Sequence, residues 1–304
     1  MSEYLRSPRA GELHDHDRGL SHDLPMIVQR GLGRRGLLSL IGGVGAVALA
    51  GCGAEESTGG GSADHPSNQG PGDPPPGGGG ASDAAVAEGE IPEETGGPFP
   101  ADGSNGVDVL SESGVVRSDI TSSFGSASGT AEGVPLTIRM KVYDLDGDDA
   151  TVLSGAAVYV WHCDREGRYS LYSQGVEDQN YLRGVQVADA DGLVRFTSVF
   201  PACYSGRWPH VHVEVYPDRA GIADAADAIA TSQVALPEQA CEAVYGQAGY
   251  EQSVTNLAQV SLAADNVFGD DAGATQLGTV TGDVTQGYAV SLAVKVDTRT
   301  TPTP

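Results

Sequence analysis

Two histidines at alternate positions open the segment HVHVEVY, residues 210–216. Alternate residues of a β-strand project from the same face, so His210, His212 and Glu214 are expected to share one face. The three valines between them form a face suited to burial. Two imidazoles this close on one face can bind one metal ion, because the imidazole nitrogen is a good ligand for iron, copper or zinc.

The number of histidines limits the kinds of metal site that are available. Of the seven histidines in the chain, three lie in the first 51 residues and His65 lies in a segment rich in glycine and proline. Only His162, His210 and His212 remain, and the strand pattern predicts His162 to be a packed structural residue. This count excludes copper sites built from many histidines, so other types of ligand are needed.

Cysteine and tyrosine are the candidates for the remaining ligands. A zinc or copper site made by Cys203, His210 and His212 is consistent with the residue types. Tyrosine is the alternative, because a bound trivalent cation can hold a phenol in its deprotonated form although its usual pKa is near 10. Tyr204 lies six residues before the first histidine, and Tyr169 follows an earlier predicted strand.

Several segments together resemble the intradiol ring-cleavage dioxygenases, the group that contains protocatechuate 3,4-dioxygenase and catechol 1,2-dioxygenase. They are WHCDREGRY at 161–169, Tyr204, and RWPHVH at 207–212. The segments ETGGPF at 94–99 and NYLRG at 180–184 are similar to the opening and the middle of the family's domain. The resemblance extends over about residues 90–236, and the ordered set of two tyrosines followed by Arg-x-Pro-His-x-His is its most specific part.

The resemblance implies a non-haem Fe(III) centre that cleaves a catechol-type aromatic with O2 to a muconate-type diacid. The implied ligands are Tyr169, Tyr204, His210 and His212. The resemblance also implies that Tyr204 leaves the metal when substrate binds and then accepts a proton. Arg207 would stabilise negative charge on the ring, and Gln233 corresponds to a glutamine near the metal.

Two departures from the family limit what can be carried over. Only Ser205 and Gly206 separate Tyr204 from Arg207, where the protocatechuate enzymes have a longer loop. The helical dimerisation domain of the catechol 1,2-dioxygenases has no counterpart before the predicted domain, where a Gly/Pro-rich segment stands instead. The substrate and the assembly therefore do not follow from the resemblance, and a non-catalytic β-sandwich binding module is the alternative function.

The sequence predicts an all-β fold, a single β-sandwich domain with few short helices. A helix is predicted over 237–245, with proline at its start and glutamate in its first turn. Strands are predicted over 136–143, 156–163, 184–188, 193–200, 210–216, 229–236 and 288–296.

Three cysteines lie in this predicted domain, Cys163, Cys203 and Cys241. An exported domain can hold disulfides. A bond between Cys203 and Cys241 is the favoured pairing, because it would fix the loop before Tyr204 to the helix. Three buried thiols are the alternative.

The N-terminal 51 residues are typical of a bacterial export signal. Arg34 and Arg35 precede an apolar run over 36–50, which is shorter than the about 20 residues that span a membrane. Leu-Ala-Gly-Cys at 49–52 resembles a lipobox, which predicts that Cys52 is lipidated; an ordinary cleaved signal is the alternative. Residues 52–89 are predicted to form a disordered tether, and 90–304 to form the domain.

The charge of the chain excludes one class of partner. The whole chain has 17 basic and 41 acidic residues, a net charge of −24. Removing the six arginines and five acidic residues of 1–51 leaves 11 basic and 36 acidic residues, a net charge of −25. Such a surface repels nucleic acid and suits a domain outside the cytoplasm. Together with the N-terminal segment, it predicts a domain that is tethered to the outer face of the membrane by a lipid, or secreted.

Overall fold

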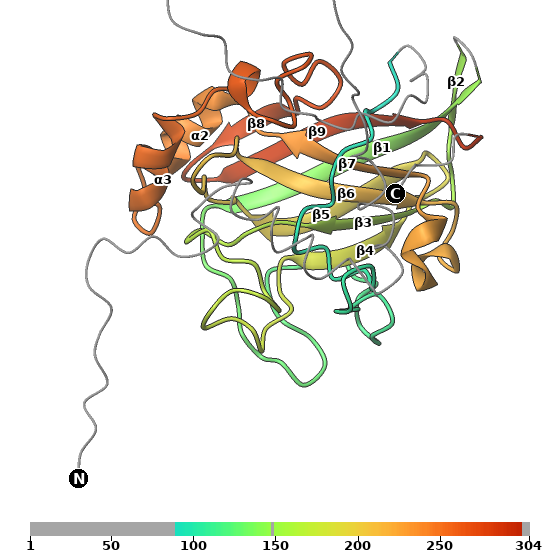
Figure 1. The fold of residues 1–304 in the computed structure, drawn as a ribbon, viewed down its shortest axis with the longest axis horizontal. Coiled ribbons are helices and arrows are strands. Elements are labelled where there is room, and N and C mark those ends of the chain that lie inside the picture. Colours follow the sequence, from blue (N-terminus) through green and yellow to red (C-terminus); the bar gives the residue numbers. More distant parts are fainter. Residues whose placement is uncertain (1–88, 147–148, 300–304) are drawn as a thin grey trace, which may run out of the picture. The chain divides into compact units, whose positions relative to one another are not determined.

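The computed structural model describes residues 89–146 and 149–299 (Figure 1). Cys52, the predicted signal over 1–51 and residues 52–88 of the predicted tether lie outside these residues. The strands are β1 (Pro135–Asp146), β2 (Asp149–Val152), β3 (Ala157–Trp161), β4 (Arg183–Val187), β5 (Leu193–Val199), β6 (His210–Tyr216), β7 (Ala230–Ala235), β8 (Thr279–Asp283) and β9 (Gly287–Val296). The helices are α2 (Glu238–Tyr245) and α3 (Glu251–Leu257), with 3-10 turns η3 (Gly221–Ala223), η4 (Ala225–Asp227) and η5 (Leu262–Ala264).

The strands form two sheets. In one, β1 pairs in parallel with β9 on one side and antiparallel with β5 and β2 on the other, and β8 pairs with β9. The other sheet is antiparallel, with the order β4-β3-β6-β7. The predicted all-β fold with few short helices is confirmed.

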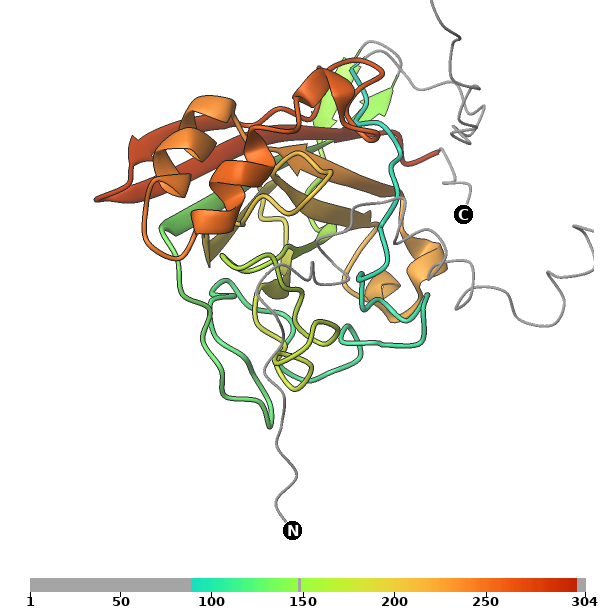
Figure 2. The ribbon, with the colours of Figure 1, turned by 60° about the vertical axis from the view of Figure 1, so that its left-hand side comes forward.

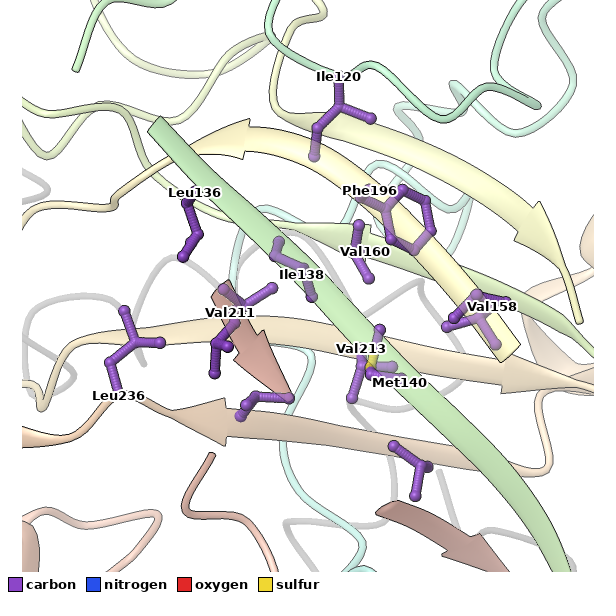
Figure 3. Close-up of a cluster of buried hydrophobic side chains, with 14 of the residues drawn as sticks. Ile120, Leu136, Ile138, Met140, Val158, Val160, Phe196, Val211, Val213 and Leu236 are labelled. Atoms are coloured by element: carbon purple, nitrogen blue, oxygen red, sulfur yellow. The ribbon is translucent and has the colours of Figure 1, made fainter. Parts of the chain in front are cut away.

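The main core lies between the two sheets. Leu136, Ile138 and Met140 alternate along β1 and meet valines from the inward face of the second sheet (Figure 3). Among these valines are Val211 and Val213, which the strand pattern of 210–216 assigned to a buried face. Burying one such side chain contributes roughly 1.5–3 kcal/mol, so this face fixes the register of β6.

The second sheet is also buried on its outward face. All seven residues of β6 and all five of β3 are buried. The outward residues Ala157, Tyr159 and Trp161 belong to a separate apolar cluster, together with Tyr169 and Tyr216. The long loops over 89–134 and 162–182 contribute to this second cluster, and most of their length lies below the strands in Figures 1 and 2. His210 and His212 therefore lie on an outward face that loops enclose.

Some elements could not be predicted from the sequence. The strand β2 is fully exposed and only four residues long, and β8 contains Gly282 and has only one residue that is not exposed, so neither shows an alternating pattern. The helix α3 contains two β-branched residues, Val254 and Thr255, which favour strands. Within the described residues, no helix has the length and apolar character needed to cross a membrane.

Candidate metal centre

Four polar atoms from three parts of the chain converge on the outward face of β6. Nε2 of His210 lies 3.1 Å from Nε2 of His212. The phenol oxygen of Tyr169 lies 3.2 Å from Nε2 of His212, and that of Tyr204 lies 3.3 Å from Nε2 of His210. The two histidines come from β6, Tyr169 from the loop after β3, and Tyr204 from the loop before β6. The structure thus brings together the four residues that the resemblance implied as ligands.

The environment of His210 leaves its Nε2 lone pair available. Its Nδ1 lies 2.6 Å from the carbonyl oxygen of Trp208, which can only accept a hydrogen bond. The Nδ1 atom must therefore carry the proton, and Nε2 of the neutral ring is an acceptor. Burial, reinforced by the positive charge of Arg207, lowers the pKa of His210 to about 3, which keeps the ring neutral.

A flat aromatic contact holds the second imidazole. The ring of His212 stacks on that of Trp161, with centroids 4.7 Å apart and an interplanar angle of 6°. Trp161 faces His212 directly in the pairing of β3 with β6. The Nδ1 atom of His212 has no hydrogen-bond partner among the described residues, so stacking and strand geometry set the orientation of the ring.

Tyr169 lies in the site, whereas the nearby Tyr172 is engaged elsewhere. The Tyr172 hydroxyl donates to Oδ1 of Asn105 at 2.9 Å and accepts from the backbone N–H of Ala101 at 3.0 Å. Tyr169 is buried, and burial together with the neighbouring Tyr204 raises its pKa well above the usual range. A phenol in this environment ionises only if a cation lies beside it.

The four atoms fit a single metal ion. Ligands at about 2.0–2.2 Å from a metal and about 90–110° apart lie roughly 3 Å from one another. The three measured separations, 3.1, 3.2 and 3.3 Å, have this size. Phenol oxygens and neutral imidazoles are also the donor types that a trivalent iron would take. The site is thus suited to a metal held by two tyrosines and two histidines.

The alternative zinc or copper site with Cys203 is wrong. Within 89–146 and 149–299, no group of three or more His, Cys, Asp and Glu side chains is placed to hold a metal ion. The thiol of Cys203 is directed at the carbonyl oxygens of Arg207, at 3.5 Å, and Tyr204, at 3.9 Å. Its partners among the described residues are thus backbone carbonyl oxygens.

The favoured disulfide is also a wrong prediction. Cys163, Cys203 and Cys241 are all buried free thiols, which was the alternative. The thiol of Cys241 is directed at the carbonyl oxygen of Leu236, at 3.9 Å, while that of Cys203 has the contacts just described. Burial raises the pKa of each thiol, to about 12 for Cys203, so none of them is an activated nucleophile.

Arg207 and Gln233 lie beside the tyrosine and histidine groups. Gln233 faces His212 in the pairing of β6 with β7, and its Oε1 atom accepts from Nη2 of Arg207 at 2.7 Å. Nε of Arg207 donates to Oδ2 of Asp265 at 3.0 Å. All three side chains are buried, so the guanidinium is held from two sides rather than lying in a surface ion pair.

The segment 94–99 covers part of the site. The carbonyl oxygen of Thr95 accepts from Nε2 of Gln233 at 3.0 Å, and the ring of Phe99 lies 5.1 Å from that of Tyr169. Gly97 has a φ of +71°, and a Cβ atom there would lie 3.5 Å from Cε1 of His212. The positive φ favours glycine at this close approach to the imidazole.

Sequence reasoning missed two residues of this neighbourhood. Asp265 lies 58 positions after Arg207 in a segment without a recognisable pattern, so nothing in the sequence connected the two. Trp161 belongs to the segment 161–169, but its stacking on His212 depends on the register of β3 against β6.

Comparisons with known proteins show what the chain is similar to. The model of a family described as "Dioxygenase" matches residues 114–220, a segment that contains both tyrosines, the arginine and both histidines. A chlorocatechol 1,2-dioxygenase of Rhodococcus opacus is 35% identical over 83 residues, which are 24% of this chain and 32% of that protein. A catechol 1,2-dioxygenase of Acinetobacter lwoffii is 36% identical over 77 residues, 25% of this chain and 26% of that protein. The chain thus matches about a third or less of the length of these curated relatives.

The similarity in fold to a solved structure extends over a longer part of the chain than these sequence matches do. An intradiol ring-cleavage dioxygenase of Tetranychus urticae superposes with a TM-score of 0.56 and 20% identity, over 70% of this chain and 97% of that one. The segment that matches the family model therefore lies within a domain of the same architecture. In this segment the chain is similar to the dioxygenase family, and in its fold it is similar to an intradiol ring-cleavage dioxygenase.

Proposed function

We propose that the protein is a non-haem Fe(III) enzyme that cleaves catechol-type aromatics with O2, between the two hydroxylated carbons, to muconate-type diacids. The observation that carries the proposal is the convergence of two phenol oxygens and two imidazole nitrogens within 3.1–3.3 Å of their neighbours. Two relatives, similar to this chain over 83 and 77 residues, are named as chlorocatechol and catechol 1,2-dioxygenases, which supports the choice of substrate class.

Tyr169, Tyr204, His210 and His212 would hold the iron. Bound there, Fe(III) would supply Lewis acidity that favours the doubly deprotonated catechol. The two imidazoles are fixed by a backbone hydrogen bond and by stacking, so they keep their positions through the reaction.

Tyr204 is the more exposed of the two tyrosines, and its phenol oxygen is the acceptor for a proton from a substrate hydroxyl. Arg207 remains charged at any physiological pH and stabilises negative charge on the substrate ring. Gln233 holds one side of the guanidinium at 2.7 Å and thereby keeps it directed at the site.

A visible absorption spectrum of purified residues 90–304, with and without catechol under nitrogen, tests this function. The expected result is a broad tyrosinate-to-iron band that shifts when catechol is added. A protein that stays colourless after iron loading would contradict it and favour a non-catalytic β-sandwich module. Cys203→Ser is the matched control, since a cysteine outside the centre should leave the colour unchanged.

We further propose that the domain acts outside the cytoplasm, anchored to the outer face of the cell membrane through a lipid on Cys52. The support is the twin-arginine segment and the lipobox-like residues 49–52, together with the acidic composition. Detergent phase partitioning of the wild type and of Cys52→Ser tests this proposal. The wild type should enter the detergent phase and the variant the aqueous phase; equal partitioning would favour a simply cleaved signal.

A further inference from the structure

Asp265 is not one of the four proposed ligands, yet its carboxylate is hydrogen-bonded to Arg207 and to the backbone beside the site. Its side chain is fully buried, and its two oxygens accept five hydrogen bonds. Oδ2 accepts from Nε of Arg207 at 3.0 Å and from the backbone N–H of Trp208 at 2.6 Å. Oδ1 accepts from Nη2 of Arg207 at 3.4 Å and from the backbone N–H groups of Val267 and Phe268, at 2.8 and 3.2 Å.

The contacts of Asp265 lead to the site by two separate routes. Through Arg207, the carboxylate is linked to Gln233 and from there to the carbonyl oxygen of Thr95. Through the backbone of Trp208, it is linked to His210, because the Trp208 carbonyl accepts from Nδ1 of that ring at 2.6 Å. One carboxylate therefore holds both the arginine and the turn that carries the first histidine.

A buried carboxylate must be compensated to remain charged. Burial raises the pKa of Asp265, but the guanidinium and the backbone N–H groups outweigh it and hold the pKa below its usual range. A buried ion pair is a weak source of stability compared with apolar side chains of the same size, because both charges lose their hydration. What such a pair provides is a fixed direction for the guanidinium, since the side chain has lost its other orientations.

We infer that Asp265 is a positioning residue, which fixes the Arg207 guanidinium in the geometry that the reaction needs. This inference rests on the function proposed above, because the role of Arg207 comes from it. The contacts to Val267 and Phe268 stabilise the turn that contains Asp265 itself, so a purely structural role is the competing explanation.

A double-mutant cycle in the iron-loaded full domain separates the two explanations. Asp265→Asn keeps the shape of the side chain and removes the charge. It is expected to retain the tyrosinate-to-iron band and to lower kcat/KM for catechol about 10–100-fold, mainly through kcat. In an Arg207→Ala background, the same change should lower kcat/KM by less than about 3-fold, because residues that act as a unit are not additive. Asp270→Asn, an exposed aspartate five positions later, is the control and should match the wild type.

Three outcomes would overturn the inference. If Asp265→Asn lowers kcat/KM by the same factor in both backgrounds, Asp265 has a structural role. If Asp265→Asn has the kcat/KM of the wild type, Asp265 has no role in the reaction. If Asp265→Asn does not fold, Asp265→Glu replaces it. That variant keeps the charge but displaces the guanidinium by about the length of a methylene group, so unchanged activity there would equally contradict positioning. A wild type that is colourless or inactive would overturn the proposed function itself, whereas an active wild type with additive variants would overturn only this inference.

Discussion

The phenol oxygen of Tyr169 lies 3.2 Å from Nε2 of His212, although 43 residues separate the two in the chain. The neighbouring Tyr172 instead hydrogen-bonds to Asn105 and Ala101. We therefore expect Tyr169→Phe to abolish the tyrosinate-to-iron band or reduce it strongly, because a phenolate ligand is lost. Tyr172→Phe should keep the band. Visible spectra and iron content of the two variants check this, and equal loss of colour in both would contradict the assignment of Tyr169.

The site is expected to prefer uncharged catechols to carboxylated ones. Two arginines lie near enough to lower the pKa of His212, Arg207 and Arg183. The charge of Arg207 is paired with Asp265, and Arg183 is fully buried with its hydrogen bonds made inside the protein. Because the proposed role of Arg207 directs its guanidinium at the substrate ring, neither arginine is left to pair with a carboxylate substituent on that ring. We expect kcat/KM for 3,4-dihydroxybenzoate to be at least about 10-fold below that for 4-methylcatechol, which corresponds to about 1.4 kcal/mol.

Measuring both substrates at low and high salt distinguishes a preference set by the site from one caused by repulsion from the acidic surface. Repulsion by the net negative charge of the chain would be largely screened at about 1 M salt, whereas a preference set inside a buried site would persist. Similar kcat/KM values for the two substrates at both salt concentrations would show that the site accepts a carboxylate.

Arg183 is expected to be important for the stability of the loop that carries Tyr169. Its guanidinium donates to the side chain and the carbonyl of Ser170, both at 3.0 Å, and to the carbonyl of Pro100 at 3.0 Å. Arg183→Met would remove all three hydrogen bonds and leave the two Ser170 acceptors without this donor, at about 1–3 kcal/mol each, whereas the Pro100 carbonyl would still accept from the Tyr159 hydroxyl at 2.7 Å. We expect the free energy of unfolding to fall by about 3 kcal/mol or more, measured by denaturant titration.

An exposed arginine provides the control for this change. Arg195→Met in β5 should alter the free energy of unfolding by less than about 0.5 kcal/mol. A loss of similar size in both variants would mean that the hydrogen bonds of Arg183 contribute little beyond those of a surface side chain.

Glu94 is expected to make stability depend on pH. Burial, reinforced by the charge of Asp270, raises the pKa of Glu94 to about 8 from a usual value near 4.5. Between these two values the folded protein holds the proton more tightly than the unfolded chain, so the free energy of unfolding falls as the pH rises from about 4.5 to 8. Glu94→Gln should flatten this fall. Melting temperatures of both proteins between pH 5 and 8 check it, and parallel curves would contradict the raised pKa.

Patterns in the sequence predicted much of the fold, and the resemblance to a known family supplied the set of proposed ligands. The strand 210–216 could be predicted because its valines alternate with polar residues, and alternation directly reports two different faces. The seven predicted strands all appear, within a few residues of their predicted ends. The short strand β2 and the glycine-containing β8 were not predictable, because they hold few buried side chains and form through pairing with β1 and β9.

Only the tertiary structure decided which side chains meet around these ligands. The choice of Tyr169 over Tyr172 depends on how the loop after β3 packs, and the exclusion of Cys203 depends on which carbonyls its thiol faces. The partnership of Asp265 with Arg207 joins residues 58 positions apart. A local sequence pattern indicates which face of a strand or helix is buried. Contacts between distant segments form only when the sheets and loops pack together, so a local pattern does not predict them.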